Sequence, residues 1–327
     1  MNLQLLAAFG LILFTGSTVS AKCAPDSVSF DGMCKGKMRS SNGGEPQIDR
    51  RAAIEENKKF LSSYYPTGGD LVDDSFNTGG FGHYVWPENN GNLSVIVVGN
   101  SWALQQHSIV RKYLPAHMTS SMEAYTASGC SIVFNHHQTL TEAFWHDMEN
   151  KRPRIVFVIL RYTYQYGDWA PYTPGNDEVL NYYQQAVDRF SKFADHIFVS
   201  SHQPFVCPIA GKANDILTRF IAALENGKDL TTLNMPYNAT EFAENPVRVR
   251  INLLFQRCKK CHLLDMDTPF INAKMNWVQV YDPKTNLAYF DNACHFTKAG
   301  LEKIDPQIEK AIHAALPEYF PTEEADE

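Results

Sequence analysis

A serine and a histidine, near opposite ends of the chain, are the residues whose type and setting best suit acyl-transfer chemistry. Ser101 directly follows an apolar segment, and His295 lies in a short polar stretch before the last helical pattern. A serine hydroxyl needs a base to become a nucleophile, and that base needs a group that orients it. Asp291 stands four residues before His295, close enough for a loop to bring its carboxylate to the imidazole.

The segments around Ser101 indicate how the chain would position it. Residues 94–98 (Ser-Val-Ile-Val-Val) have the pattern of a fully buried strand, and residues 103–114 have a helical pattern. Open parallel sheets place their sites at the carboxyl ends of the strands. Ser101 would then begin a helix, where free backbone amides can bind an oxyanion. The alternative is that Ser101 is only a helix cap.

The rest of the chain alternates between strand and helix patterns. Further strands are predicted at residues 121–125, 155–160, 196–200 and 277–280, and a loop segment at 66–92. Helices are predicted at residues 48–65, 140–150, 179–194, 215–224, 240–260 (broken at Asn245-Pro246) and 298–315. This alternation predicts one α/β domain over residues 46–320, a three-layer α/β/α arrangement around a parallel sheet of about five strands. Residues 321–327 form an acidic tail.

The first 21 residues have the pattern of a secretory signal peptide. The apolar run 5–14 is shorter than the roughly 20 residues that cross a bilayer. Small residues at Val19 and Ala21 predict cleavage after Ala21. No Lys or Arg precedes the run, so an uncleaved signal anchor is the alternative. We therefore expect a secreted protein without stable membrane insertion.

All seven cysteines follow this segment, where an oxidising compartment favours disulfides. Cys23 and Cys34 are the expected pair of a small leader, residues 22–45. Cys258 and Cys261 form a C-x-x-C motif, for which a structural disulfide, a redox pair and half a zinc site are all open. The other half of a zinc site does not follow at standard spacing, and we predict no metal or cofactor. Asn92 and Asn238 begin glycosylation sequons, which agree with secretion.

Composition excludes several classes of protein. Hydrophobic residues make up 44% of the chain, which excludes a disordered or collagen-like protein. Lys and Arg total 29 against 36 Asp and Glu, a formal net charge of −7. This balance does not indicate a nucleic-acid partner.

At the level of motifs, the chain resembles the SGNH hydrolases, also called GDSL esterases. Residues 97–103, V-V-G-N-S-W-A, resemble their first block, in which Gly-Asp-Ser follows the first strand. Residues 291–300, D-N-A-C-H-F-T-K-A-G, resemble their last block, Asp-x-x-His with a following Gly. The closer resemblance is to the SGNH domain behind the membrane portion of acyltransferase-3-type O-acyltransferases, as found in nematodes.

The resemblance implies a flavodoxin-like SGNH fold and a set of site residues. By position, Ser101 would be the nucleophile, His295 the general base and Asp291 its orienting acid. The backbone amides of Ser101 and Gly129 would donate to the oxyanion. The substrate would be an acyl ester, with acetyl the best expectation, and the acceptor would be water or a glycan hydroxyl.

The sequence departs from the family pattern in three places. Asn100 stands where many members have Asp, and the Asp-to-His spacing is one residue longer, so that Asn292 occupies the usual position. The strand at 155–160 runs into Arg161-Tyr162, without the oxyanion-donating Asn of hydrolytic members. Arg161 could replace that donor, bind an anionic group, or form a salt bridge at a strand end.

Other candidate substrate-binding residues are Asn100, Tyr162 and His202. Tyr162 could belong to an aromatic wall and His202, after a predicted strand, could line the cleft, with core packing and structural hydrogen bonding as the alternatives. We therefore expect a secreted SGNH-type serine esterase or O-acyltransferase. The alternatives are a catalytically impaired relative that binds glycans, or a partner of a membrane acyltransferase.

Overall fold

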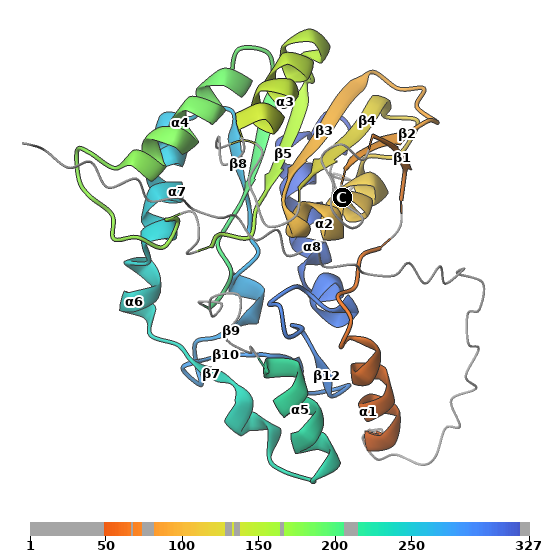
Figure 1. Cartoon of the computed structure of the whole chain (residues 1–327), viewed down its shortest axis with the longest axis vertical. Helices are drawn as coiled ribbons and strands as arrows, with labels where there is room; N and C mark the ends of the chain where they lie inside the picture. The colour runs from red at the N-terminus through yellow and green to blue at the C-terminus, as the bar shows by residue number, and fades with distance from the viewer. Residues whose placement is uncertain are drawn as a thin grey trace, which may run out of the picture. The chain divides into compact units, whose positions relative to one another are not determined.

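A mixed sheet of seven strands forms the centre of the protein (Figure 1). The computed structural model describes residues 49–66, 68–73, 82–127, 133, 138–163, 167–205 and 215–320, without the side chains of 73 and 138–140. The predicted signal peptide and leader, with Cys23 and Cys34, lie outside the described residues, as do Gly129 and the acidic tail.

The sheet has the strand order β1-β2-β4-β3-β5-β6-β8. Its strands are β1 (Asp70–Asp73), β2 (His83–Trp86), β3 (Leu93–Gly99), β4 (Thr119–Thr126), β5 (Ile155–Ile159), β6 (His196–Ser200) and β8 (Cys261–Leu264). The five strands from β4 to β8 in this order are parallel, and β2 and β1 continue the sheet as antiparallel strands beyond β4. Numbered along the chain, the parallel strands have the order 2-1-3-4-5 of flavodoxin-like folds.

Helices cover both faces of this sheet, which makes three layers. The helices of the described residues are α1 (Arg50–Lys59), α2 (Ser101–Tyr113), α3 (Gln138–Lys151), α4 (Glu178–Phe190), α5 (Ile216–Glu225), α6 (Ala239–Ala243), α7 (Pro246–Arg257) and α8 (Lys298–Ala315), of which α2, α3, α4, α7 and α8 pack on the sheet. Side chains of a strand point alternately to its two faces. Val95 and Val97 pack in one core with α2 and α8, whereas Ile96 and Val98 pack in the other with α3, α4 and α7. Figure 1 shows these two groups of helices on opposite sides of the sheet.

The predicted three-layer fold with five parallel strands is confirmed, but one strand was assigned wrongly. Residues 277–280 do not join the central sheet. They contribute β10 (Trp277–Val278) to a small antiparallel sheet with β7 (Met235–Pro236) and β9 (Ile271–Asn272). The fifth parallel strand is β8, a short Cys-His-Leu-Leu segment at the sheet edge. Because only Leu264 of this strand is fully buried, it lacks the apolar run typical of a buried strand.

Two other expectations also need correction. The predicted loop 66–92 contains β1 and β2, short strands whose side chains are mostly not buried. The predicted helix 48–65 ends at Lys59, and residues 60–65 continue without helical structure. The long helix predicted at 240–260 divides into α6 and α7 at the expected Asn245-Pro246 break.

Gly99 lets the two central strands end side by side. It pairs with Ile159 of β5, and a Cβ at this position would lie 1.9 Å from the Ile159 carbonyl oxygen. Only glycine fits such a close approach. Ser101 therefore begins α2 beside the end of β5.

In the part of the chain that the structure describes, none of the helices has the length and hydrophobicity needed to span a membrane.

Candidate active site

Ser101 lies where the direction of strand connection changes. The chain leaves β3 through α2 to reach β4 on one side, and later reaches β5 on the other side through α3. In open α/β sheets, ligands bind at this switch point, outside the carboxyl ends of the strands. Ser101 is the first residue of α2, with its side chain at the positive end of the helix.

Asn100 joins the ends of the two central strands. Its Oδ1 accepts hydrogen bonds from the amides of Trp102 (3.2 Å) and Arg161 (2.9 Å), and its Nδ2 donates to the carbonyl of Arg161 (2.9 Å). An aspartate could not donate the last of these bonds. The first departure from the family pattern thus has a structural reason, and the Asn100 side chain holds the backbone rather than facing a ligand.

His295 approaches Ser101 from the loop that precedes α8. Its Nε2 lies 2.8 Å from Ser101 Oγ, and both side chains are buried. The loop is fixed by the start of α8, where the Thr297 hydroxyl accepts a bond from the Gly300 amide. A Cβ on Gly300 would lie 2.1 Å from the Tyr289 carbonyl oxygen, which explains why a glycine follows the histidine at this spacing.

Asp291 holds both the loop and the imidazole. Its Oδ1 accepts bonds from the amides of Ala293 (2.7 Å) and His295 (2.9 Å), and its Oδ2 lies 3.5 Å from His295 Nδ1. Cys294, between them, has a φ of 59°, so the chain turns tightly enough for an Asp four residues upstream to reach the ring. Burial alone would raise the pKa of the Asp291 carboxyl, but its contacts with His295 and Ser63 outweigh burial and hold it below the ordinary value.

Asn292, at the usual family spacing, faces away from His295. Its Oδ1 accepts from the amides of Leu217 (3.0 Å) and Thr218 (3.1 Å) at the start of α5. Asn292 therefore caps a helix, and Asp291 is the residue that faces the imidazole.

Two residues of the site were not predicted from sequence. Ser63 Oγ lies 2.8 Å from Asp291 Oδ2 and 3.1 Å from His295 Nδ1, and the edge of the Tyr65 ring meets the His295 ring at 5.8 Å between centroids. Ser63 and Tyr65 lie in residues 60–65, after the end of α1, where the sequence pattern predicts that the helix continues. Pro66 was the available signal, because a residue before proline disfavours helical backbone.

Arg161 lies next to this group of residues. Its Nη1 donates to the carbonyl of Ala293 in the histidine loop. Burial lowers the pKa of the Arg161 guanidinium, and the charge of Asp291 opposes this effect. This hydrogen bond to the backbone of the site loop is a further role, beside the three that the sequence left open for Arg161.

Tyr162 and His202 are interior residues with structural partners. The Tyr162 hydroxyl donates to the carbonyl of Ser200 (2.9 Å), and only 2% of the residue is exposed. His202 Nδ1 lies 2.7 Å from Asp267 Oδ2, which also contacts Arg248 Nη1 at 2.8 Å. Neither side chain contacts Ser101 or His295 among the described residues, so the geometry favours the packing and hydrogen-bonding alternatives.

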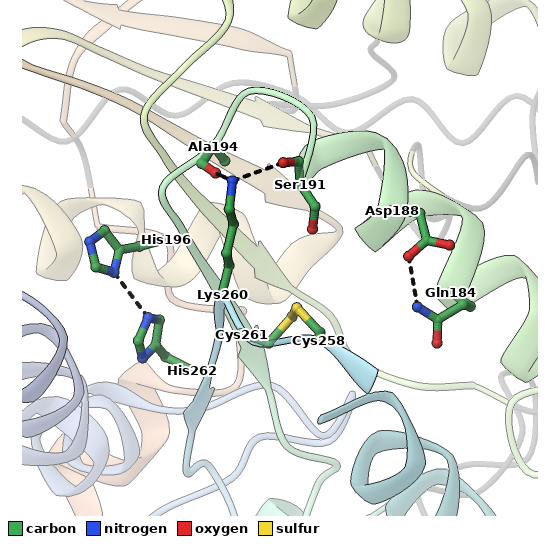
Figure 2. The surroundings of a disulfide bond; sticks show 9 residues. All are labelled: Gln184, Asp188, Ser191, Ala194, His196, Cys258, Lys260, Cys261 and His262. Atoms are coloured by element: carbon green, nitrogen blue, oxygen red, sulfur yellow. Dashed lines mark hydrogen bonds between the residues drawn. A yellow bond between two sulfur atoms is a disulfide. The ribbon is translucent and has the colours of Figure 1, made fainter. Parts of the chain in front are cut away.

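The C-x-x-C motif lies at the amino end of the edge strand β8, whereas Ser101 follows the carboxyl end of the central strand β3. Cys258 and Cys261 are joined by a disulfide at the start of β8, as Figure 2 shows. His262 forms a 3.0 Å hydrogen bond with His196 instead of joining a metal site. Cys294 is also disulfide-bonded. Within the described ranges, no three His, Cys, Asp or Glu side chains are grouped as metal ligands.

Both sequon asparagines are exposed. Asn92 Oδ1 accepts a bond from the Tyr319 hydroxyl (2.9 Å), and Asn238 caps α6 through the amides of Thr240 and Glu241. Each side chain is therefore open to solvent.

The fold and the site define a three-layer α/β protein that gathers a serine, a histidine and an aspartate at the carboxyl edge of its sheet. The family model described as "SGNH domain (fused to AT3 domains)" matches residues 72–310, and the chain belongs to this family. By family it is thus an SGNH-type esterase or acyltransferase. No curated protein matches the sequence.

Similar solved structures include the C-terminal catalytic domain of peptidoglycan O-acetyltransferase A from Streptococcus pneumoniae, with 14% identity over 69% of this chain and 94% of that one (TM-score 0.34). A GDSL-like lipase from Bacteroides thetaiotaomicron has 13% identity over 82% and 98% (0.39). A catalytic mutant of an acetylxylan esterase from Geobacillus stearothermophilus has 11% identity over 70% and 96% (0.39).

Proposed function

We propose that this protein is a secreted serine esterase or O-acyltransferase that acts on acyl esters. Ser101 Oγ attacks the acyl carbonyl carbon while His295 Nε2 takes the hydroxyl proton. The tetrahedral intermediate then collapses, and the departing alcohol receives that proton. In the second half, water or a sugar hydroxyl attacks the acyl-enzyme and gives its proton to His295. The bond from the acyl carbon to Ser101 Oγ then breaks, His295 returns the proton to Oγ, and the acid or the new ester is released.

The 2.8 Å contact between Ser101 Oγ and His295 Nε2 is the observation that carries this proposal. It is within the distance needed for direct proton transfer from a nucleophile to its base. Asp291 supplies the negative charge that stabilises the imidazolium formed in each half-reaction. All three side chains are buried, which strengthens these charge interactions relative to water.

Stabilisation of the oxyanion would come from backbone amides at the start of α2. Ser101 is the first helical residue, where amides lack helical partners, and Gly129 remains the expected second donor. The Asn donor of hydrolytic relatives is missing, and losing one such donor typically costs about 10²–10³ in rate. A slow enzyme, or one that depends on Arg161 near the site loop, is the expected consequence.

The acyl group is proposed to be acetyl and the acceptor a glycan hydroxyl. Fusion of the family's SGNH domains to acyltransferase-3 domains supports a working context with a membrane acyltransferase as partner. Secretion is supported by the signal-like residues 1–21 and by the two exposed sequons. Expression in a secretory eukaryotic cell, with mass measured before and after glycan removal, tests this localisation.

The alternative is a glycan-binding relative that has lost catalysis, favoured by the missing Asn donor. A fluorophosphonate probe, which labels activated serines, separates the two proposals. We expect labelling of the wild type and of Ser62→Ala, an exposed serine used as control, but not of Ser101→Ala. Absence of labelling, or labelling that survives Ser101→Ala, would reject the nucleophile. Release of acetate from acetylated sugars, with and without a sugar acceptor, then distinguishes hydrolysis from transfer.

A further inference from the structure

We propose that Ser63 is a positioning residue that connects Asp291 to His295 in this site. The inference rests on the proposed function, because it concerns how the general base is oriented. The distance between Asp291 Oδ2 and His295 Nδ1 is 3.5 Å, which is longer than an ordinary hydrogen bond. Ser63 Oγ lies at 2.8 Å from the first atom and 3.1 Å from the second.

The donors and acceptors of this bridge are determined by the chemistry of the three groups. Asp291 is an ionised acceptor, so the single hydroxyl proton of Ser63 is donated to Oδ2. The Ser63 oxygen can then accept a hydrogen bond from the Nδ1–H group of His295. This tautomer leaves the lone pair of Nε2 directed at Ser101 Oγ, which is the form that a general base requires.

Helix α1 holds Ser63 at this position. The side chain of Asn57, fully buried in α1, donates to the Asn286 carbonyl (2.8 Å) and accepts from the Ala288 amide (2.8 Å). These contacts fix α1 against the hairpin formed by β11 (Tyr281–Asp282) and β12 (Leu287–Ala288). The segment that follows α1 is thereby directed toward the histidine loop.

Gln105 of α2 fixes the same segment from the other side. Its Nε2 donates to the carbonyls of Tyr64 (2.7 Å) and Phe296 (2.8 Å), and its Oε1 accepts from the Phe296 amide (3.2 Å). Tyr64 follows Ser63 and Phe296 follows His295. One buried side chain therefore sets the positions of both residues relative to the helix that carries Ser101.

Tyr65 lies beside the bridge, next to both Ser63 and His295. Burial raises the pKa of the Tyr65 hydroxyl, and a hydrogen bond with Ser63 partly offsets this rise. The phenol therefore remains protonated at neutral pH beside Ser63, while its ring lies edge-on to His295.

The bridge comes from outside the matched family region. The family model begins at residue 72, whereas α1 and Ser63 precede it, within the same compact unit of Glu45–Glu327. An N-terminal segment thus completes a site that the family region alone would leave with a long Asp–His contact.

The test compares Ser63→Ala with Ser63→Thr, which keeps the hydroxyl, and with Ser62→Ala. Ser62 is an exposed neighbour whose hydroxyl donates to the Lys59 carbonyl. Second-order rates of fluorophosphonate labelling and kcat and KM for an acetyl ester are measured, with thermal unfolding as a check on folding. Ser63→Ala should lower the labelling rate and kcat about 10- to 100-fold with KM within about twofold. Ser63→Thr should recover most of the loss, and Ser62→Ala should match the wild type.

A double-mutant cycle with Asp291→Asn separates positioning from general structural support. If Ser63 acts through Asp291 and His295, Ser63→Ala should change the rate less than about twofold in the Asp291→Asn background. Wild-type rates in Ser63→Ala, or an equal loss in both backgrounds, would overturn the bridge. Failure of the proposed function is a different result, since the wild type would then not be labelled at Ser101 at all.

Discussion

The side-chain amide of Asn100 forms two hydrogen bonds with the backbone of Arg161, one as acceptor and one as donor, each 2.9 Å long. The contact joins the ends of β3 and β5, on either side of the point where Ser101 begins α2. A position where many relatives carry an acid is here used to hold two strands at a fixed separation.

Replacing Asn100 with Asp should therefore destabilise the protein despite the small change in shape. At pH 7 the introduced carboxylate would face the Arg161 carbonyl without a proton to donate, at a cost of about 1–3 kcal/mol. The difference from wild type should shrink near pH 4, where a protonated carboxyl can donate. Urea unfolding of both proteins at the two pH values measures this. Equal stability at pH 7 would contradict the role given to Asn100.

Asp291 and Asn292 should behave in opposite ways when replaced. Asp291→Asn should lower kcat/KM by about 10²–10⁴, because the imidazolium loses its charged partner. Asn292→Ala should leave kcat/KM within a few-fold and instead cost about 1 kcal/mol of unfolding free energy, because the amides of Leu217 and Thr218 lose their cap. Kinetics on an acetyl ester and chemical denaturation of both variants test this pair. A large loss of activity in Asn292→Ala alone would reverse the assignment.

His107 should make the protein less stable as the pH falls. It is buried in α2, stacked on Tyr84 and edge-on to Trp86, and burial lowers its pKa from 6.5 to about 4. The unfolded chain binds a proton between these values and the folded chain does not, so stability falls as pH drops from about 6.5 to about 4. The loss from this one group is about 3 kcal/mol at pH 4.

The substitution His107→Phe keeps the ring and removes the titration. The unfolding free energy of wild type relative to His107→Phe should therefore decline by about 3 kcal/mol from pH 7 to pH 4. Denaturation curves of both proteins across this range give the difference, in which other titrating groups cancel. A constant difference would show that His107 titrates alike in the folded and unfolded chains, and that burial does not lower its pKa.

The disulfide between Cys258 and Cys261 should contribute modestly to stability and not to catalysis. It closes a loop with a sequence separation of 3, for which the chain-entropy estimate is about 2 kcal/mol. Cys261 begins the edge strand β8, which β5 and β6 separate from the strand β3 that leads to Ser101. The double variant Cys258→Ser/Cys261→Ser should thus unfold at lower urea concentration while its kcat/KM stays unchanged. Loss of activity without loss of stability would argue for a redox role.

The sequence alone determined the layers and the two ends of the proposed site. The Val-rich run of β3 and the helical pattern after it are strong local signals, because buried strands and amphipathic helices have distinct periods. The position of Ser101 between them, and of His295 before α8, follows from these local patterns. Because parallel strands place their sites at their carboxyl ends, these patterns also predict that the site lies at that edge of the sheet.

Tertiary structure alone decided which polar neighbours complete the arrangement. The choice between Asp291 and Asn292 depends on a left-handed turn at Cys294 and on a helix start 75 residues away in sequence. The approach of Ser63 depends on where α1 ends and on Asn57 binding a hairpin 229 residues later. Such contacts have no local period, because they arise between segments that only packing brings together. For that reason the sequence determined where the chemistry lies, and the fold decided how its base is held.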